Sequence, residues 1–149
     1  MASVEIYAKV VELAEEGKAF VLASVIVARG STPQKAGANA VFESTGEMEG
    51  TLGGGCLEAE SRRRALQALD DDAPEVFDLK LDDVKGWDDG LICGGSVRVL
   101  VNPLAAENTA VYREVLAAKD RQERGVLATV GKHPELAKGK AVWTPEEAL

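Results

Sequence analysis

The chain is poor in three residue types that often organise small proteins. Aromatic residues make up only 5% of its 149 residues, so Val, Leu, Ile and Ala must supply most of the core. Its two cysteines, Cys56 and Cys93, are too few for a disulfide scaffold. Its single histidine, His133, leaves a zinc site of Cys and His ligands poorly supplied. We therefore expect an aliphatic core rather than a fold held by disulfides or zinc.

Long apolar runs and an excess of positive charge are also absent. The longest apolar stretch, residues 19–28, has roughly half the length that a bilayer-spanning helix requires. The N-terminus does not have the pattern of a secretory signal. We therefore expect no membrane segment and a cytoplasmic location. Seventeen basic residues against 25 acidic ones give a net charge of −8, which argues against a nucleic-acid partner.

What is present is an alternation of helical and strand patterns along the whole chain. Apolar residues at helical spacing predict a helix over residues 4–14, with Gly17 at its C-terminal cap. The β-branched run at 19–28 predicts a strand buried on both faces. Further helices are expected at 56–70, 106–118 and 146–149, and further strands at 39–43, 75–81, 96–102, 126–130 and 141–144. These elements predict a single domain over residues 1–149, of the α/β or α+β class, with a mixed β-sheet flanked by helices.

A glycine-rich segment leads directly into the helix expected at 56–70. Residues 50–58 read GTLGGGCLE, and the consecutive Gly53, Gly54 and Gly55 are costly to order unless the main chain must be approached closely. The start of a helix presents unpaired amides and a positive dipole end, which favour an anion. Cys56 lies at this start, where a thiolate is favoured. The alternative is a tight turn followed by a buried cysteine. The Walker and GxGxxG spacings are absent, which argues against a nucleotide triphosphatase.

A second cysteine adjoins glycines at the entrance to the strand expected at 96–102. Cys93 is followed by Gly94 and Gly95 in the sequence GLICGG. A glycine pair at a β-bulge would explain the pattern without any ligand. If the two cysteine-glycine turns converge, paired thiols beside an anion pocket would suit soft metals, sulfur transfer or redox exchange.

A third polar segment follows the strand expected at 19–28. Its sequence, RGSTP, offers the hydroxyls of Ser31 and Thr32 and the charge of Arg29 for a phosphate. A local turn closed by a Ser or Thr hydroxyl is the alternative. His133 is expected in an exposed loop. On the helix at 56–70, Glu58 and Glu60 each precede an arginine by four residues, which predicts Glu58–Arg62 and Glu60–Arg64 pairs on a solvated face.

Taken in order, the segments GSTP, GTLGGGCLEAE and GLICGGSVRVLVNPL resemble the xanthine dehydrogenase accessory protein family, XdhC/CoxI. The resemblance covers residues 4–104 and leaves 105–149 as a C-terminal extension. It implies a chaperone that binds the molybdenum cofactor, molybdopterin, as cargo, assists its sulfuration and delivers it to a client enzyme. The client would be a molybdenum hydroxylase of the xanthine or carbon monoxide dehydrogenase type.

The resemblance also assigns roles to residues. Cys56 becomes the cofactor-contacting thiolate and a molybdenum contact, and the glycines of the GGG run become an anion cradle. The remaining pocket residues would be Cys93, Gly94, Gly95, Ser31 and Thr32. No residue is assigned a catalytic role, so we expect a binding and delivery protein rather than an enzyme. One departure is Gln34, which stands where many members resemble GS[ST]PR and carry an arginine after the proline.

The same resemblance suggests partners. Larger members carry a C-terminal Rossmann-like domain, which we expect to be missing here. The protein would then be either a stand-alone N-terminal module or the partner of a separate Rossmann-type chain. A cysteine desulfurase and a second copy of the chain, forming a homodimer, are the other expected partners. Two rival hypotheses remain: a thiol-dependent sulfurtransferase or redox protein that uses Cys56 and Cys93, and a structural component of a dehydrogenase assembly.

Overall fold

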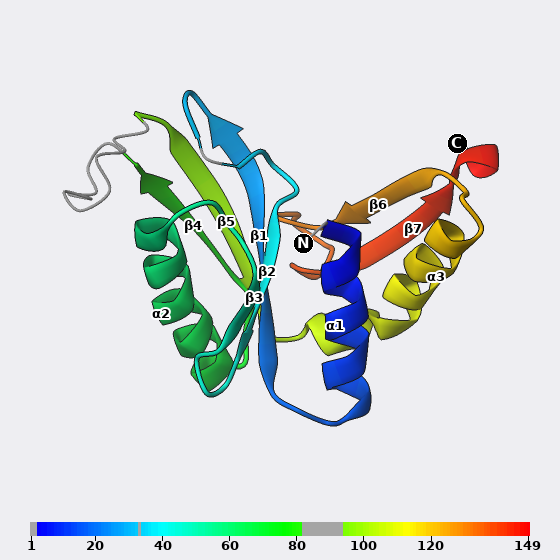
Figure 1. Cartoon of the computed structure of the whole chain (residues 1–149), viewed down its shortest axis with the longest axis horizontal. Coiled ribbons are helices and arrows are strands. Elements are labelled where there is room, and N and C mark those ends of the chain that lie inside the picture. Colours follow the sequence, from blue (N-terminus) through cyan, green and yellow to red (C-terminus); the bar gives the residue numbers. More distant parts are fainter. Residues whose placement is uncertain (1–2, 33, 82–93) are drawn as a thin grey trace.

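The computed structural model describes residues 3–32, 34–81 and 94–149, and Cys93 lies outside these ranges (Figure 1). The strands form a five-stranded sheet in the order β3-β2-β1-β5-β4 and a separate β6–β7 hairpin. The helices are α1 (Ser3–Glu15), α2 (Gly55–Asp71) and α3 (Thr109–Asp120), with 3₁₀ turns at Ala105–Asn108 and Glu146–Ala148. The strands are β1 (Phe20–Arg29), β2 (Asn39–Glu43), β3 (Met48–Gly50), β4 (Glu75–Lys80), β5 (Ser96–Asn102), β6 (Gly125–Thr129) and β7 (Ala141–Pro145).

Strand β1 forms the centre of the molecule and is buried on both faces in its first half. Val21, Ala23 and Val25 pack into the core beneath α2, whereas Phe20 and Leu22 pack into the core formed with α1 and α3. Alternation along a strand sends successive side chains to opposite faces, and helices cover both faces here (Figure 1). The prediction of a strand buried on both faces is confirmed for this half. Within the described residues, no helix is long and apolar enough to cross a bilayer.

The expected single α/β domain is confirmed, with one difference in the sheet. Every strand pairing among the described residues is antiparallel, whereas the sequence predicted a mixed sheet. Strand β3, only three residues long, was not predicted; it forms a hairpin with β2. The expected C-terminal cap of the first helix is confirmed, because Gly17 has a φ of 69° and its amide donates to the Ala14 carbonyl.

Four segments that are distant in sequence meet at one end of the sheet. Arg29, at the end of β1, pairs with Ser96 at the start of β5, and Ser96 also pairs with Lys80 at the end of β4. Only residues 72–74 separate α2 from β4, so α2 runs antiparallel to β4 and begins at this same end (Figure 1). We call the end marked by Arg29, Ser96 and Lys80 the loop end.

Candidate functional site: the glycine loop at the start of helix α2

The loop of residues 50–56 is closed by a side-chain bridge. The Thr51 hydroxyl donates to the Glu58 carboxylate at 2.7 Å, and the Leu52 amide donates to the same oxygen at 3.2 Å. The Gly53 amide in turn donates to the Thr51 hydroxyl oxygen at 3.1 Å. Neither Thr51 nor Glu58 was assigned a site role from the sequence. Their position on either side of a GGG run, one in the loop and one in the first turns of the helix, is the signal that could have indicated the bridge.

The bridge also corrects one prediction. The expected Glu58–Arg62 pair is wrong, because the Glu58 carboxylate faces the loop. Arg62 instead donates to the Gly46 carbonyl at 2.9 Å and lies over the Phe42 ring at 5.7 Å. The predicted Glu60–Arg64 pair is confirmed at 3.0 Å. The first turns of α2 therefore contact the glycine loop through Glu58, and the next turn contacts the sheet through Arg62.

The glycines of this loop differ in what the fold requires of them. At Gly50, a Cβ would lie 2.6 Å from the Asn39 carbonyl oxygen, so packing against β2 demands glycine. Gly53 has a φ of 116°, a conformation that side chains disfavour. Gly54 has an extended φ of 173°, and a Cβ on either Gly54 or Gly55 would meet no described atom within 4 Å. The fold itself therefore gives no reason for glycine at 54 and 55.

Helix α2 begins at this loop without a side-chain cap. Gly54 is the N-cap residue and makes no side-chain hydrogen bond, and the first helical bond runs from the Glu58 amide to the Gly54 carbonyl at 2.9 Å. The amides of Gly55 and Cys56 thus precede the helical hydrogen-bond ladder. Cys56, the second residue of the helix, is half-buried rather than sealed in the core. An uncapped helix start and an accessible sulfur occupy the same turn.

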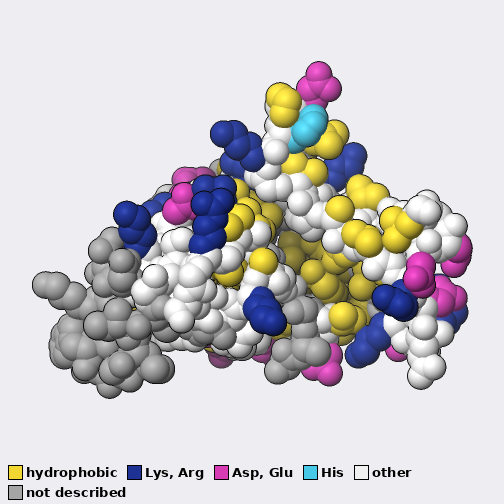
Figure 2. Space-filling model, turned by 90° about the horizontal axis from the view of Figure 1, so that it is seen from above, with side chains coloured by type: hydrophobic (Ala, Val, Ile, Leu, Met, Phe, Trp, Pro, Cys, Tyr) yellow, Lys and Arg dark blue, Asp and Glu magenta, His cyan; other side chains and the backbone are white. Residues whose placement is uncertain are grey.

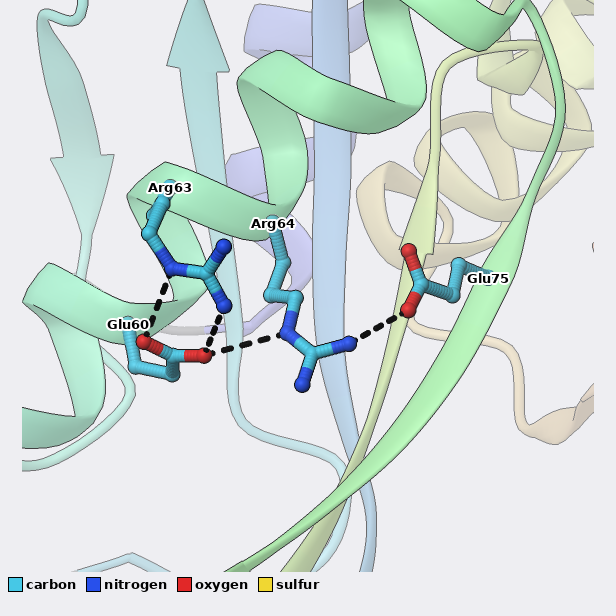
Figure 3. A network of polar contacts seen from close by, with 4 residues as sticks. All are labelled: Glu60, Arg63, Arg64 and Glu75. Carbon is cyan, nitrogen blue, oxygen red and sulfur yellow. Dashed lines mark hydrogen bonds and ion pairs between the residues drawn. The ribbon is translucent and has the colours of Figure 1, made fainter.

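An ion-pair network fixes the direction of α2 (Figure 3). Glu60 accepts from Arg63 at 2.6 Å and from Arg64 at 3.0 Å, and Arg64 also donates to Glu75 on β4 at 2.6 Å. Hydrogen bonds from Arg63 and then Arg64 lower the pKa of Glu60 to about 2. Arg64 also lies over the Phe77 ring at 5.0 Å. These contacts tie the helix to the edge strand and so hold its first turn at the loop end.

Two of the other predicted segments lie against each other at the loop end. A Cβ on Gly95 would collide with the Ser31 carbonyl oxygen and would lie 2.8 Å from the Thr32 methyl group, so glycine allows a close main-chain approach. Gly30 has a φ of 73°, and a Cβ there would lie 3.3 Å from the Gly95 Cα. The irregularity in the β1–β5 pairing falls between Val25 and Val27. The glycine at 95 is thus explained by packing against residues 29–32 and not by a bulge.

For the remaining predicted site residues, the structure bears out some expectations and leaves others untested. Thr32 donates its hydroxyl to the Gln34 carbonyl at 2.9 Å, which is the local turn considered as the alternative. Gly94 has a φ of 65° and faces open space among the described residues. Cys93 lies outside the described residues, so its convergence with Cys56 stays a prediction. His133 lies in an exposed loop, as predicted, and its Nδ1 accepts from two backbone amides. Among the residues that the structure covers, no group of three His, Cys, Asp or Glu side chains could hold a metal ion.

The chain is similar to one protein family and to two curated proteins. Residues 13–80 match the model of the XdhC and CoxI family. One relative, a probable xanthine dehydrogenase component from Bacillus subtilis strain 168, is 31% identical over 106 residues, which cover 69% of this chain and 32% of that protein. The uncharacterized protein YqeB of Escherichia coli strain K12 is 30% identical over 97 residues, which cover 65% of this chain and 18% of that protein.

A solved structure extends the similarity to the whole chain. The crystal structure of a xanthine dehydrogenase from Bacillus halodurans matches with a TM-score of 0.76 and 25% identity, over 100% of this chain and 44% of that one. The chain therefore spans less than half the length of each of these three relatives. Residues 105–149, which lie beyond the family model, are part of this shared fold.

Proposed function

The chain carries a domain of the XdhC and CoxI family, and on this premise we propose that it binds the molybdenum cofactor as cargo for a client molybdenum hydroxylase. The seat of the cofactor is the start of α2, with Gly53–Gly55 as the anion cradle and Cys56 as the sulfur ligand. The client is of the xanthine or carbon monoxide dehydrogenase type. The protein acts in the cytoplasm as a carrier, and it assists sulfuration while the cargo is bound.

The observation that carries this proposal is the pair Gly54–Gly55. Neither position needs glycine for its backbone conformation or for packing against the described residues. A side chain there would project into the space in front of the helix start and would keep a ligand away from the amides. Glycine at both 54 and 55 is therefore explained if a ligand approaches the main chain at these positions.

The chemistry of the donors fits the proposed cargo. When bound, the molybdenum cofactor brings a phosphate group and a thiophilic metal held by sulfur. The amides of Gly55 and Cys56 and the positive end of the α2 dipole favour an anion such as this phosphate. The Cys56 thiol lies in the same turn and offers a soft sulfur ligand. Because it is half-buried, it is only partly exposed to oxidants in solution. The Thr51–Glu58 bridge holds the loop in shape beside them.

The partners belong to the same proposal. A cysteine desulfurase would supply the sulfur, a separate Rossmann-type chain would complete the longer architecture of the relatives, and a second copy would shield the cargo in a homodimer. Because the chain spans only 32% of the Bacillus subtilis relative, the Rossmann-type partner is tested most simply by co-expression with the remaining region of that protein. Copurification with that region, and not with an unrelated Rossmann protein, is the expected result.

The proposal is tested by expressing the chain in a host that makes the molybdenum cofactor. Molybdenum is measured by mass spectrometry, and the pterin by the fluorescence of its oxidised form, in purified wild type, Cys56→Ala and Cys56→Ser. We expect molybdenum and pterin in the wild type and a loss of at least about tenfold in both variants, because serine keeps the size but not the soft sulfur. Equal background levels in all three proteins would reject the carrier function and favour the hypothesis of a structural component.

The sulfurtransferase hypothesis is distinguished by Cys93→Ala. If Cys56 and Cys93 act as a catalytic pair, this variant loses turnover of a thiosulfate or disulfide substrate. The carrier proposal instead expects no such turnover in the wild type.

A further inference from the structure

A basic cleft lies on the face of the sheet opposite α2. Val97, Val99 and Phe77 point into the core beneath α2, so the intervening Arg98 and Asp78 point to the other face. The pairing register sets Arg29, Ser96 and Lys80 side by side in the next row, at the loop end. Side chains directly opposite each other in antiparallel strands share a face. The side chains of Arg29 and Lys80 therefore lie next to the Arg98–Asp78 ion pair.

The loop between β6 and β7 forms the other wall of this cleft. Lys132 and Lys138 line it together with Arg98 and Asp78, and it encloses about 490 Å³. Gly131 brings the loop close to the sheet, because a Cβ there would lie only 3.3 Å from the Ile26 side chain. Figure 2, which views the loop end, shows dark blue side chains on both sides of the projecting loop that carries the single histidine, in cyan.

The cleft is positively charged, whereas the chain as a whole is negatively charged. The chain has 17 basic and 25 acidic residues, yet the charged residues lining this cleft and the adjoining hollow are Arg29, Lys80, Arg98, Lys132, Lys138 and Asp78. Asp78 is taken up by Arg98, with bonds of 2.7 and 3.2 Å. The other four cations form no ion pair with any carboxylate in the part of the chain that the structure describes. Among the described residues, five cations therefore face one carboxylate in the cleft and the adjoining hollow, and an anionic ligand would balance this excess.

The volume and the lining of the cleft restrict the kind of anion that it can bind. Its volume falls within the range of small-molecule sites, and Ile26, Val27 and Val76 provide apolar wall beside the cations. A rod of nucleic acid is disfavoured by the net charge of −8. An acidic protein surface would have to enter a concave space between a sheet and a loop. A compact phosphate with an organic group attached satisfies both the cations and the apolar wall.

We infer that this cleft is a binding site for the phosphate or diphosphate group of a small organic ligand. Lys132 and Lys138 hold the phosphate from the loop side and Arg98 faces it from the sheet side, while Arg29 and Lys80 line the adjoining hollow and add positive charge nearby. The ligand is a nucleotide, whose base would lie against the apolar wall of Ile26, Val27 and Val76. The site lies on the other face of the sheet from the start of α2, so it does not depend on the proposed cofactor seat.

The site is tested by titrating the ¹⁵N-labelled full chain with inorganic pyrophosphate and following its amide signals by NMR. Shifts are expected at Arg29, Arg98, Gly131 and Lys132. The variant Lys132→Glu/Lys138→Glu should weaken pyrophosphate binding by at least about tenfold. The matched control Lys18→Glu/Lys119→Glu, with the same change in net charge on distant surfaces, should stay within about twofold of the wild type. If the charge reversal impairs folding, Lys132→Gln/Lys138→Gln gives the same comparison.

Several outcomes would overturn the inference. Shifts confined to residues 53–57 would place the anion at the start of α2 instead. Equal loss in both double variants would reduce the effect to net charge alone. Pyrophosphate binding no tighter than sulfate would show no phosphate selectivity, and tighter binding of a polyglutamate peptide at the same amides would make the cleft a protein-docking surface.

A second titration with cytidine diphosphate tests for the nucleotide. Added shifts at Ile26, Val27 and Val76, together with tighter binding than pyrophosphate, support a nucleotide. Equal affinity of the two probes, with competition by purified molybdopterin, would overturn the nucleotide as the ligand of this cleft. Because Cys56→Ala leaves the cleft intact, unchanged pyrophosphate binding in that variant keeps this inference separate from the proposed carrier function.

Discussion

Thr51 and Glu58 hold the glycine loop closed through a hydrogen bond of 2.7 Å between hydroxyl and carboxylate. Because Glu58 also accepts from the Leu52 amide, one side chain fixes both the entrance of the loop and the first turns of α2. We predict that Glu58→Ala destabilises the protein by about 1 kcal/mol in urea unfolding, since two hydrogen bonds are lost. The control is Glu114→Ala, an exposed glutamate on α3, which should change stability by less than about 0.5 kcal/mol. Equal effects of the two substitutions would contradict the bridge.

The glycines of the loop should respond differently to alanine. Gly55→Ala should leave stability unchanged or raise it by up to about 1 kcal/mol, because Gly55 is the first helical residue and faces open space. Gly53→Ala should lower it by about 1–3 kcal/mol, because its φ of 116° is strained for alanine. Thermal unfolding followed by circular dichroism measures both. The same Gly55→Ala protein should carry less cofactor, which separates a binding role from a folding role.

The stability of α2 should depend on pH through Glu60. Its folded-state pKa is lowered from 4.5 to about 2 by Arg63 and Arg64, so its contribution is complete above pH 4.5. That contribution is lost as the pH falls from 4.5 to about 2, because the unfolded state takes up its proton first. Solvent screening limits the effect to about 1 kcal/mol. Denaturant midpoints across this range should fall more in the wild type than in Glu60→Gln, and parallel curves would argue against the network in Figure 3.

The elements that were predicted from the sequence are those with strong local patterns. The β-branched run of β1 and the apolar spacing of α1 each indicate one structure, and both were placed within one or two residues. Strand β3 has only Met48, Glu49 and Gly50, which have no such pattern; it exists because β2 lies beside it. The antiparallel direction of the sheet is likewise set by which strands meet, and local periodicity does not carry that information.

The candidate site shows the same division. The GGG run and Cys56 at a helix start were identified from the sequence, because they are adjacent in the chain. The Thr51–Glu58 bridge was missed because a carboxylate on a helix can face either an arginine or a loop, and only the folded chain decides. The basic cleft could not be predicted at all. Its cations come from β1, β4, β5 and the β6–β7 loop, which only tertiary structure brings together.

The two tyrosines should each ionise at a higher pH than an exposed tyrosine does. Tyr7 and Tyr112 stack with ring centroids 4.7 Å apart, and burial raises the pKa of Tyr112 to about 12 and raises that of Tyr7. The chain has no other tyrosine, so its absorbance at the phenolate band reports these two alone. We expect the phenolate signal to develop above pH 10, with stability falling as the pH rises from 10 towards 12. A midpoint near 10 in the folded protein would contradict the buried stack.

The central claim is that the uncapped amides at the start of α2 seat the anionic cargo. Hydrogen–deuterium exchange, resolved to single amides, tests it in the wild-type chain with and without purified molybdenum cofactor. We expect slower exchange at Gly54, Gly55 and Cys56 in the loaded protein, with no change along α3. Bound cofactor with unchanged exchange at these three amides would contradict it.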